Sequence, residues 1–307
     1  MIKPFVKWAG GKSKVLEQLI PLLPKNINSD NMVYVEPFVG GGAMAFQILK
    51  MFPKIKRIII SDINKELIDC YHVIAHSPEQ LIDELRFLEK RYLSLNIEDR
   101  KRLFLYIRDE YNKTKGYIND KIHLTAMFIF LNKTCFNGLY RVNKDGMFNT
   151  SFGKYEKPLI CDYETILEDS SLLRDNRVSI YDMDFSDILS CISKEEKEVF
   201  FYLDPPYYPI SETSCFTEYS KDGFDGDNNK RLLDFCYTLN MFKYKFLLNN
   251  SYVKNEEEDI SMFEKMYSDF NISYITANRS INSDGAKRGR ITELAITNYC
   301  EKLNNDV

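Results

Sequence analysis

Residues 199–207 read Val-Phe-Phe-Tyr-Leu-Asp-Pro-Pro-Tyr, an apolar run that stops at an acid, two prolines and an aromatic residue. The run has the length and aromatic content of a buried strand, and the prolines after it can neither join a strand ladder nor begin a helix at once. Asp204 therefore falls at the carboxyl end of a strand, the edge of an open α/β sheet where ligands bind. This rigid turn suits gripping a planar ring that carries an amino group, although Asp204 could instead cap a local turn.

A second predicted strand, at residues 32–38, runs into the glycine turn Val39-Gly40-Gly41-Gly42, and a helical pattern follows. Strand, glycine turn and helix form the nucleotide-cradling unit of doubly wound folds. A further strand ends at Asp62, about 20 residues later, where a carboxylate can accept hydrogen bonds from ribose hydroxyls. Asp62 could also cap the helix that begins near Asn64.

Strand patterns recur after a long helical stretch, and helical patterns separate several of them. We expect strands at residues 32–38, 58–62, 178–181, 199–203, 245–248, 272–276 and 293–299. The alternation predicts an α/β fold with a doubly wound, mostly parallel sheet of seven strands. We assign residues 1–70 and 160–307 to this sheet domain and residues 71–159 to an inserted domain.

The inserted domain is predicted to be helical up to about residue 129 and then to form a β-hairpin around Lys144-Asp145-Gly146. Residues 133–157 contain five bases and two acids, interleaved with aromatic residues, and residues 279–293 contain four bases and two acids. A hairpin of this composition can enter a DNA groove, and the two basic stretches can follow phosphates. Both could also be ordinary solvated surface.

Several function classes lose support from the composition. The seven cysteines are scattered and form no C-x-x-C pair, which indicates reduced thiols rather than disulfides or a zinc site. Val6 stands where a phosphate-binding P-loop needs glycine, so the Gly10-Gly11-Lys12 turn is not that motif. Neither a membrane-spanning run nor a signal peptide is visible, and we expect a cytoplasmic protein that needs neither metal nor membrane.

The residues at the predicted sheet edge suit group transfer to an amine. An exocyclic amino group of a nucleobase is a poor nucleophile, because its lone pair is delocalised into the ring. The Asp204 carboxylate and the Pro205 carbonyl could accept its two protons and free the lone pair, while Tyr207 stacks on the ring. The activated group would come from a bound nucleotide-like donor.

Four ordered motifs give the chain a family resemblance. It resembles the Dam-type (D12 class, alpha group) DNA adenine-N6 methyltransferases, and most closely the DpnM-like enzymes of GATC restriction–modification systems. The motifs are Lys7-Trp8-Ala9-Gly10-Gly11-Lys12, Glu36-Pro37-Phe38-Val39-Gly40-Gly41-Gly42, Phe136-Asn137-Gly138-Leu139-Tyr140-Arg141 and Asp204-Pro205-Pro206-Tyr207. The resemblance implies a class I S-adenosylmethionine-dependent methyltransferase fold with an inserted helical and β-hairpin DNA-recognition domain.

The resemblance also implies roles for individual residues. The catalytic residues would be Asp204, Pro205, Pro206 and Tyr207. S-adenosylmethionine would be bound by Trp8, Lys12, Glu36, Phe38, Gly40, Gly42, Asp62, Asp184, Phe185 and Asp204. DNA would be bound by Lys7, Phe136, Asn137, Leu139, Arg141 and Asn149. The methyl group would pass directly to N6 of an adenine flipped out of double-stranded DNA.

The target sequence and the biological setting are further expectations from the resemblance. GATC is the expected site, although Ser151 stands where the family usually has proline, and other branches of the family read longer sites that contain GAT. A cognate restriction endonuclease would be a genetic rather than a physical partner. Two alternatives stay open: methylation of another exocyclic amine, such as cytosine N4 or an RNA base, and a DNA-binding module that keeps the fold without turnover.

Overall fold

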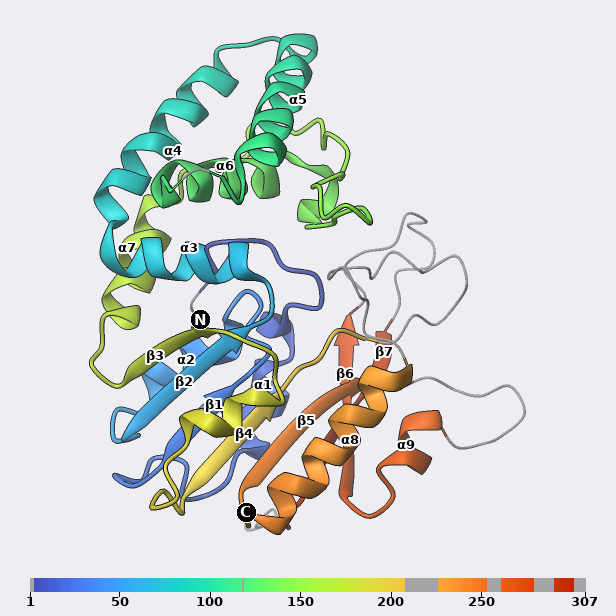
Figure 1. The fold of residues 1–307 in the computed structure, drawn as a ribbon. Coiled ribbons are helices and arrows are strands. Elements are labelled where there is room, and N and C mark those ends of the chain that lie inside the picture. The colour runs from blue at the N-terminus through green and yellow to red at the C-terminus, as the bar shows by residue number, and fades with distance from the viewer. Residues whose placement is uncertain (1–2, 118, 208–225, 253–260, 279–289, 301–307) are drawn as a thin grey trace.

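The computed structural model describes residues 3–117, 119–207, 226–252, 261–278 and 290–300. Its centre is a seven-stranded sheet in the order β3-β2-β1-β4-β5-β7-β6 (Figure 1). The strands are β1 (Val33–Glu36), β2 (Arg57–Asp62), β3 (Val178–Asp182), β4 (Val199–Leu203), β5 (Lys245–Ser251), β6 (Asn271–Asn278) and β7 (Arg290–Thr297). The first five run parallel, and β7 is antiparallel to both β5 and β6. The predicted α/β fold and its mostly parallel sheet are confirmed.

Helices make up most of the remaining described chain. They are α1 (Leu16–Leu19), α2 (Ala43–Met51), α3 (Lys65–His76), α4 (Pro78–Leu93), α5 (Ile97–Thr114), α6 (Lys121–Thr134), α7 (Tyr163–Leu173), α8 (Gly226–Met241) and α9 (Met262–Met266), with the short 3-10 turns η1 (Lys12–Lys14), η2 (Ile20–Leu22), η3 (Phe136–Gly138) and η4 (Asp187–Cys191). The chain after Lys12 forms η1, α1 and η2 in succession, and Pro21 lies in the last of these turns.

Strand β4 shows why the sheet needs a layer on each face. All of its residues are buried. Phe200 and Tyr202 pack into one apolar cluster, while Phe201 and Leu203 pack into a second cluster that also contains residues of α8. Because successive side chains of a strand point to opposite faces, an apolar run without alternation is what a doubly covered strand requires.

The strand order reverses between β1 and β4, which are direct neighbours. In open α/β sheets the crevice at such a reversal, beyond the carboxyl ends of the strands, is the usual ligand site. The glycine turn follows β1, and Asp204 follows β4. The fold therefore brings two motifs that lie far apart in the sequence to one crevice.

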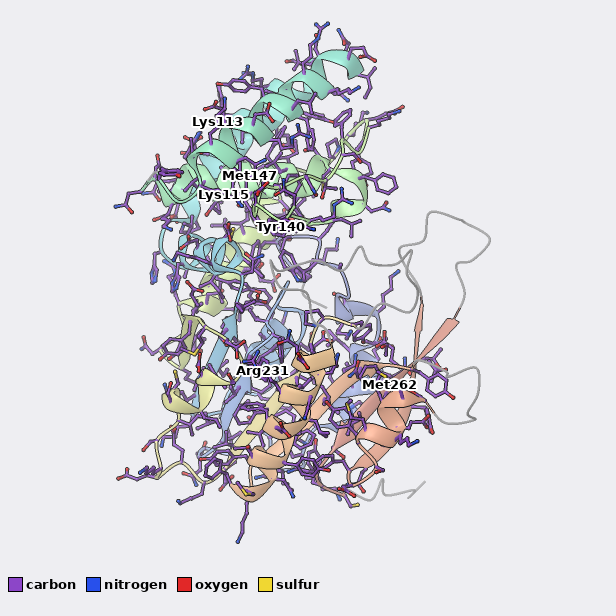
Figure 2. All side chains as sticks on the ribbon, turned by 45° about the vertical axis from the view of Figure 1, so that its right-hand side comes forward. Lys113, Lys115, Tyr140, Met147, Arg231 and Met262 are labelled. Carbon is purple, nitrogen blue, oxygen red and sulfur yellow. The ribbon has the colours of Figure 1, made fainter. Side chains whose placement is uncertain are left out.

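Helices α4, α5 and α6 form a lobe beyond α3, on the side of the molecule away from α8 and α9 (Figure 1). Its interior is apolar and includes Tyr92, Phe104 and Phe130. An ion pair of 3.2 Å between Lys115, at the end of α5, and Glu66 of α3 connects the lobe to the sheet domain. Lys115 lies on the inner side of this lobe, near Met147 and Tyr140 (Figure 2).

The predicted β-hairpin is much shorter than the sequence suggested. Only two isolated antiparallel bridges form, Cys135 with Phe152 and Val142 with Phe148. Asn112 of α5 binds the outer edge of this segment, where its side chain accepts from the Phe148 amide at 2.7 Å and donates to the Phe148 carbonyl at 2.9 Å. The segment is thus held by a helix side chain, and the left-handed backbone of Asn137 and Gly138 ends its extended run.

The described part of the chain contains six of the seven cysteines. The six cysteines in the described residues are free, and four of them are buried. Cys215 lies outside the described residues. No helix among the described residues is long and apolar enough to cross a membrane.

Candidate active site and DNA-facing surface

The glycine turn after β1 is tightly built. Gly40 has a positive φ of 48°, and a Cβ on it would lie 2.8 Å from Cδ1 of Trp8. Its amide donates to Asp62 Oδ2 at 3.0 Å, and its carbonyl accepts from the Tyr71 hydroxyl at 2.9 Å. Only glycine fits here without displacing the indole. Gly42 also has a positive φ, of 79°, and caps the start of α2.

Asp62 holds this turn from the end of β2. Its second oxygen accepts the amide of Asn64 at 2.9 Å. The N-cap of α3 is Asn64 itself, whose side chain accepts from the Leu67 amide, so the alternative of Asp62 as the cap is wrong. Burial raises the pKa of Asp62 to about 6, even though the backbone hydrogen bonds act in the opposite direction.

Glu36 lies at the end of β1 and is buried. Its Oε2 accepts a hydrogen bond of 2.5 Å from the Tyr34 hydroxyl. Burial raises the pKa of Glu36 well above its ordinary value, and the Tyr34 bond opposes that shift only in part. A buried acid therefore lies beneath the crevice, close enough to Asp204 for the two carboxyls to influence each other.

Lys12, Asp204 and Tyr207 form one cluster at the carboxyl end of β4. The Lys12 ammonium lies 2.9 Å from Asp204 Oδ1, donates to the Tyr207 hydroxyl at 2.6 Å and donates to the Gly10 carbonyl at 3.1 Å. Lys12 is only 4% exposed, whereas Asp204 is 19% exposed and so reaches solvent. The structure therefore places Lys12 on the acid of the Asp-Pro-Pro-Tyr motif.

The protonation of Asp204 reflects two opposing effects. Burial raises its pKa to about 6, and the positive charge of Lys12 acts to lower it. The acid is therefore ionised at neutral pH and loses its charge in mildly acidic solution. A carboxylate with these properties can accept hydrogen bonds from an amino group and can take up a proton near pH 6.

Two residues of this cluster were missed as site residues from the sequence. Asn249 of β5 donates to the Tyr207 hydroxyl at 2.8 Å and to Glu293 of β7 at 3.0 Å. Both side chains are buried. The available signal was the presence of polar residues within an apolar strand, since Asn249 and Asn250 directly follow Phe246-Leu247-Leu248.

Asp184 and Phe185 lie together beyond β3, as predicted. Asp184 accepts hydrogen bonds from Ser186 and lies 2.7 Å from Arg231 of α8. Phe185 is buried, with its ring 5.2 Å from that of Phe38. The Arg231 guanidinium lies over the Phe185 ring at 5.0 Å, and Arg231 lies in the first turns of α8 (Figure 2).

The N-terminal motif connects the crevice to the helical lobe. The Trp8 ring packs against the glycine turn and stacks on Tyr140, with the ring centroids 5.7 Å apart. Lys7, its neighbour, has its ammonium 4.7 Å from the centre of the Tyr155 ring. Asn132 of α6 binds both the amide and the carbonyl of Lys7, at 2.9 and 2.8 Å.

Apart from Lys7, the predicted DNA-binding residues lie along one loop region of the lobe. Phe136 is 46% exposed, and the Asn137 amide donates to the Tyr155 hydroxyl at 3.0 Å. Arg141 Nε donates to Asn149 Oδ1 at 2.7 Å, so these two predicted DNA-binding residues contact each other directly. The Leu139 carbonyl accepts from the Thr150 hydroxyl, which fixes the loop between these residues.

A basic pocket of about 420 Å³ lies beside this loop. It is lined by Lys7, Lys133, Tyr155, Glu156, Lys157, Pro158 and Leu159. Burial lowers the pKa of Lys133 to about 8. Two bases of the first basic stretch, Lys133 and Lys157, thus line this pocket. Residues 279–289 of the second stretch lie outside the described part of the chain.

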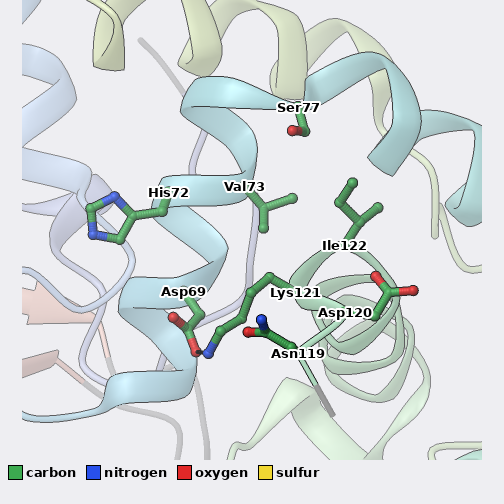
Figure 3. Close-up of a pocket in the computed structure, with 8 residues that line it drawn as sticks. All are labelled: Asp69, His72, Val73, Ser77, Asn119, Asp120, Lys121 and Ile122. Atoms are coloured by element: carbon green, nitrogen blue, oxygen red, sulfur yellow. Dashed lines mark hydrogen bonds and ion pairs between the residues drawn. The ribbon is translucent and has the colours of Figure 1, made fainter.

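A second pocket, of about 330 Å³, lies between α3 and the start of α6 (Figure 3). Its lining includes His72 and an ion pair between Asp69 and Lys121 (Figure 3), and it contains none of the predicted site residues. Within the described residues, no group of acids, histidines and cysteines is arranged to hold a metal ion.

Known proteins are similar in sequence to this chain over nearly its full length. Residues 8–281 match the family described as D12 class N6 adenine-specific DNA methyltransferase. The Type II methyltransferase M.MjaIII of Methanocaldococcus jannaschii is 43% identical over 300 residues, which cover 97% of this chain and 99% of the relative. The Type II methyltransferase M1.LlaDCHI of Lactococcus lactis subsp. cremoris is 34% identical over 97% of this chain and 96% of its own. The DNA adenine methylase of Vibrio cholerae is 29% identical over 95% and 94%, respectively.

The match spans the motifs, the sheet and the helical lobe, and two relatives exceed 30% identity over almost the entire chain. The observed fold, with its glycine turn and its Asp-Pro-Pro-Tyr cluster in one crevice, agrees with that relationship. The chain therefore belongs to the D12 class of N6 adenine-specific DNA methyltransferases.

Proposed function

We propose that this adenine-specific DNA methyltransferase uses S-adenosylmethionine to methylate N6 of an adenine flipped out of double-stranded DNA, at the sequence GATC. The observation that carries the proposal is the cluster of Lys12, Asp204 and Tyr207 at the point where the strand order reverses. It combines a partly exposed carboxylate with an aromatic ring at the sheet edge where ligands bind.

The residues around the crevice fit the proposed methyl donor. Bound S-adenosylmethionine supplies a methyl group activated by a positively charged sulfur. Gly40 and Gly42 keep the turn free of side chains, and Asp62 holds that turn at the end of β2. Phe38 and Phe185 provide apolar faces for an adenine ring, while Trp8, Lys12, Glu36 and Asp184 complete the proposed binding set.

In the proposed reaction, Asp204 and the Pro205 carbonyl accept the two N6 hydrogens of the adenine. This draws the nitrogen toward tetrahedral geometry, so its lone pair can form the new bond to the methyl carbon. The donor would supply this methyl group, and its sulfur would keep the electron pair of the broken carbon–sulfur bond. Asp204 can then take the surplus N6 proton. Tyr207 stacks on the base, and Pro206 stiffens the turn.

The lobe is the proposed sequence reader, with residues 71–159 as the recognition domain and residues 1–70 and 160–307 as the catalytic domain. Lys7, Leu139 and Arg141 would contact bases, Phe136 and Asn137 would fill the opened duplex, and Asn149 would hold Arg141. Arginine binding to guanine O6 and N7 is a common specific contact. Flipping the adenine costs a few kcal/mol, because stacking and pairing are lost.

The resemblance to DpnM-like enzymes supports GATC as the target. Two relatives carry names of Type II methyltransferases, which supports a restriction–modification setting with a cognate endonuclease as genetic partner. We also propose that the enzyme acts in the cytoplasm.

The direct test is methyl incorporation from radiolabelled S-adenosylmethionine into matched duplexes that contain GATC, GATG or no GAT. Label confined to the adenine of GATC is the expected result. Label in every GAT-containing duplex would contradict the proposed target, and label on cytosine or RNA would contradict the proposed substrate. Binding without incorporation would indicate a module that does not turn over.

Replacing Asp204 tests the proposed chemistry. Asp204→Ala should abolish methyl transfer and leave duplex binding in place, since the carboxylate is lost and the lobe is untouched. Single-turnover incorporation and fluorescence anisotropy with a GATC duplex measure the two properties. Asp234→Ala, on the exposed side of α8, is the matched control. Normal turnover by Asp204→Ala would refute the assigned role.

A further inference from the structure

Two buried polar side chains next to β4 have no part in the mechanism proposed above. Asn249 of β5 is fully buried, and Glu293 of β7 is 5% exposed. In the antiparallel pairing of these strands, Asn249 is opposite Ala295, and Ser251 is opposite Glu293. The two side chains therefore lie diagonally on the same face of the sheet, within reach of each other.

Asn249 and Glu293 continue the hydrogen-bond network that begins at Lys12. The Asn249 amide nitrogen donates one hydrogen to the Tyr207 hydroxyl at 2.8 Å and the other to Glu293 Oε2 at 3.0 Å. An ionised carboxylate can only accept hydrogen bonds. Glu293 therefore fixes which way the amide faces, because the reverse orientation would place the amide oxygen against the carboxylate.

The Tyr207 hydroxyl is held on several sides. It accepts hydrogen bonds from Lys12 at 2.6 Å and from Asn249 at 2.8 Å, so its own hydrogen needs a separate acceptor. Burial and the nearby Asp204 and Glu293 carboxylates raise the pKa of Tyr207 well above its usual value, and Glu293 hydrogen-bonds with the phenol. The phenol thus keeps its proton and can donate a hydrogen bond to Glu293.

Glu293 also influences the charge balance of the cluster. Its Oε2 lies 3.9 Å from the Lys12 ammonium, whose shorter contact is with Asp204 at 2.9 Å. Two carboxylates thus share one buried ammonium, and each helps to keep Lys12 in place. If Glu293 were neutral, Lys12 would lose one of its two ionic partners, and Asn249 would be able to turn around.

We propose that Glu293, acting through Asn249, is a positioning residue that fixes the Tyr207 phenol and the Lys12 ammonium, and so sets the geometry of Asp204. The inference rests on the proposed roles of Asp204 and Tyr207. A ring that stacks on a flipped base must be held in one orientation, and its hydroxyl is the only polar group by which the protein can hold it. Preorganisation of this kind acts on the rate of the chemical step more than on binding.

A different explanation would be that the pair only stabilises the β5–β7 pairing. In that case, substitution would lower the midpoint of unfolding and the yield of folded enzyme, while each folded molecule would keep its normal rate. A positioning role predicts the opposite, a slower chemical step in a folded enzyme that still binds its duplex.

The test compares the rate of methyl transfer to a GATC duplex by the wild type, Glu293→Gln, Tyr207→Phe and the double variant. The rates are measured under single-turnover conditions with saturating S-adenosylmethionine. Glu293→Gln keeps the shape and removes the charge, and we expect the rate to fall about 10- to 100-fold with unchanged duplex affinity. Because Tyr207→Phe already removes the hydroxyl, adding Glu293→Gln to it should cause a smaller further loss. Glu264→Gln, in the capping box of α9, is the matched control and should keep the wild-type rate.

Three outcomes would overturn the inference: a normal rate in Glu293→Gln, a loss explained entirely by unfolded protein, or an equal loss with and without the Tyr207 hydroxyl. The proposed function would survive each of them, provided that Asp204→Ala is inactive and the wild type labels GATC. Normal turnover by Asp204→Ala would instead remove the proposed function itself.

Discussion

Lys12 is a positive charge that the fold has almost withdrawn from water. Its three ammonium hydrogens are accounted for by the Gly10 carbonyl, the Tyr207 hydroxyl and the Asp204 carboxylate. Burying a charge is costly unless it is paired and hydrogen-bonded, and removing one partner leaves the other uncompensated. Removing either Lys12 or Asp204 would therefore leave the other charge without its nearest ionic partner.

The pH dependence of methyl transfer should report this pairing. The pKa of Asp204 is about 6, and we expect the single-turnover rate to fall as the pH drops through this value, because a protonated acid can no longer accept both a hydrogen bond and a proton. Lys12→Gln removes the charge that lowers this pKa. The acidic limb of the pH–rate profile should therefore move to higher pH.

The control for that shift is Lys14→Gln, an exposed lysine two residues further along the same turn. The other titratable groups coupled to Asp204 in the described residues are Tyr34, Glu36, Tyr202, Tyr207 and Glu293. All of these stay in place in both variants. If the acidic limb of the pH–rate profile lay at the same pH in Lys12→Gln as in the wild type, another group would control the rate.

At the scale of elements, the glycine turn after β1 is joined to β2 by Asp62 and to α3 by Tyr71. The backbone of this short turn therefore connects β1, β2 and α3. Local sequence predicted the turn correctly, because three consecutive glycines after an apolar strand have few other structural uses.

Gly40→Ala should disturb the turn without disrupting the sheet. The left-handed backbone costs a non-glycine residue about 1–2 kcal/mol, and the added methyl would also collide with Trp8. We expect a lower melting temperature and weaker binding of S-adenosylmethionine, measured by calorimetry. Gly226→Ala, where a Cβ meets nothing within 4 Å, should change neither. Unchanged affinity in Gly40→Ala would place the donor elsewhere.

The loop that contains Arg141 and Asn149 gives a separate prediction. Arg141 is oriented by Asn149, and Arg141→Ala should reduce discrimination at one base pair by about 1–3 kcal/mol. Methylation rates on duplexes with each single-base change measure this loss. Lys144→Ala, exposed in the adjacent turn, should not alter the preference among bases. If Arg141→Ala weakened all duplexes equally, Arg141 would be assigned to a phosphate.

Across the whole molecule, the sequence predicted what depends on local pattern. The strand at 199–203 is observed with the predicted bounds, since a buried parallel strand is visible as an uninterrupted apolar run. The cluster around Asp204 was predictable in part, because Asp-Pro-Pro-Tyr is contiguous. Asn249 and Glu293 were not, since their hydrogen bond joins residues 44 positions apart. The contact between Asn112 and Phe148 could not be predicted for the same reason, because it joins residues 36 positions apart.

Lys7 and Trp8 are consecutive, yet Lys7 lies against Tyr155 and Trp8 lies against the glycine turn. Asn132 holds the backbone of this dipeptide from α6 on both sides. The residue that would contact a base pair, Lys7, is therefore joined directly to the residue that would help to bind the methyl donor, Trp8. A shift at either end can pass to the other through this dipeptide or through the stack of Trp8 on Tyr140, and such a route would make catalysis depend on the correct DNA.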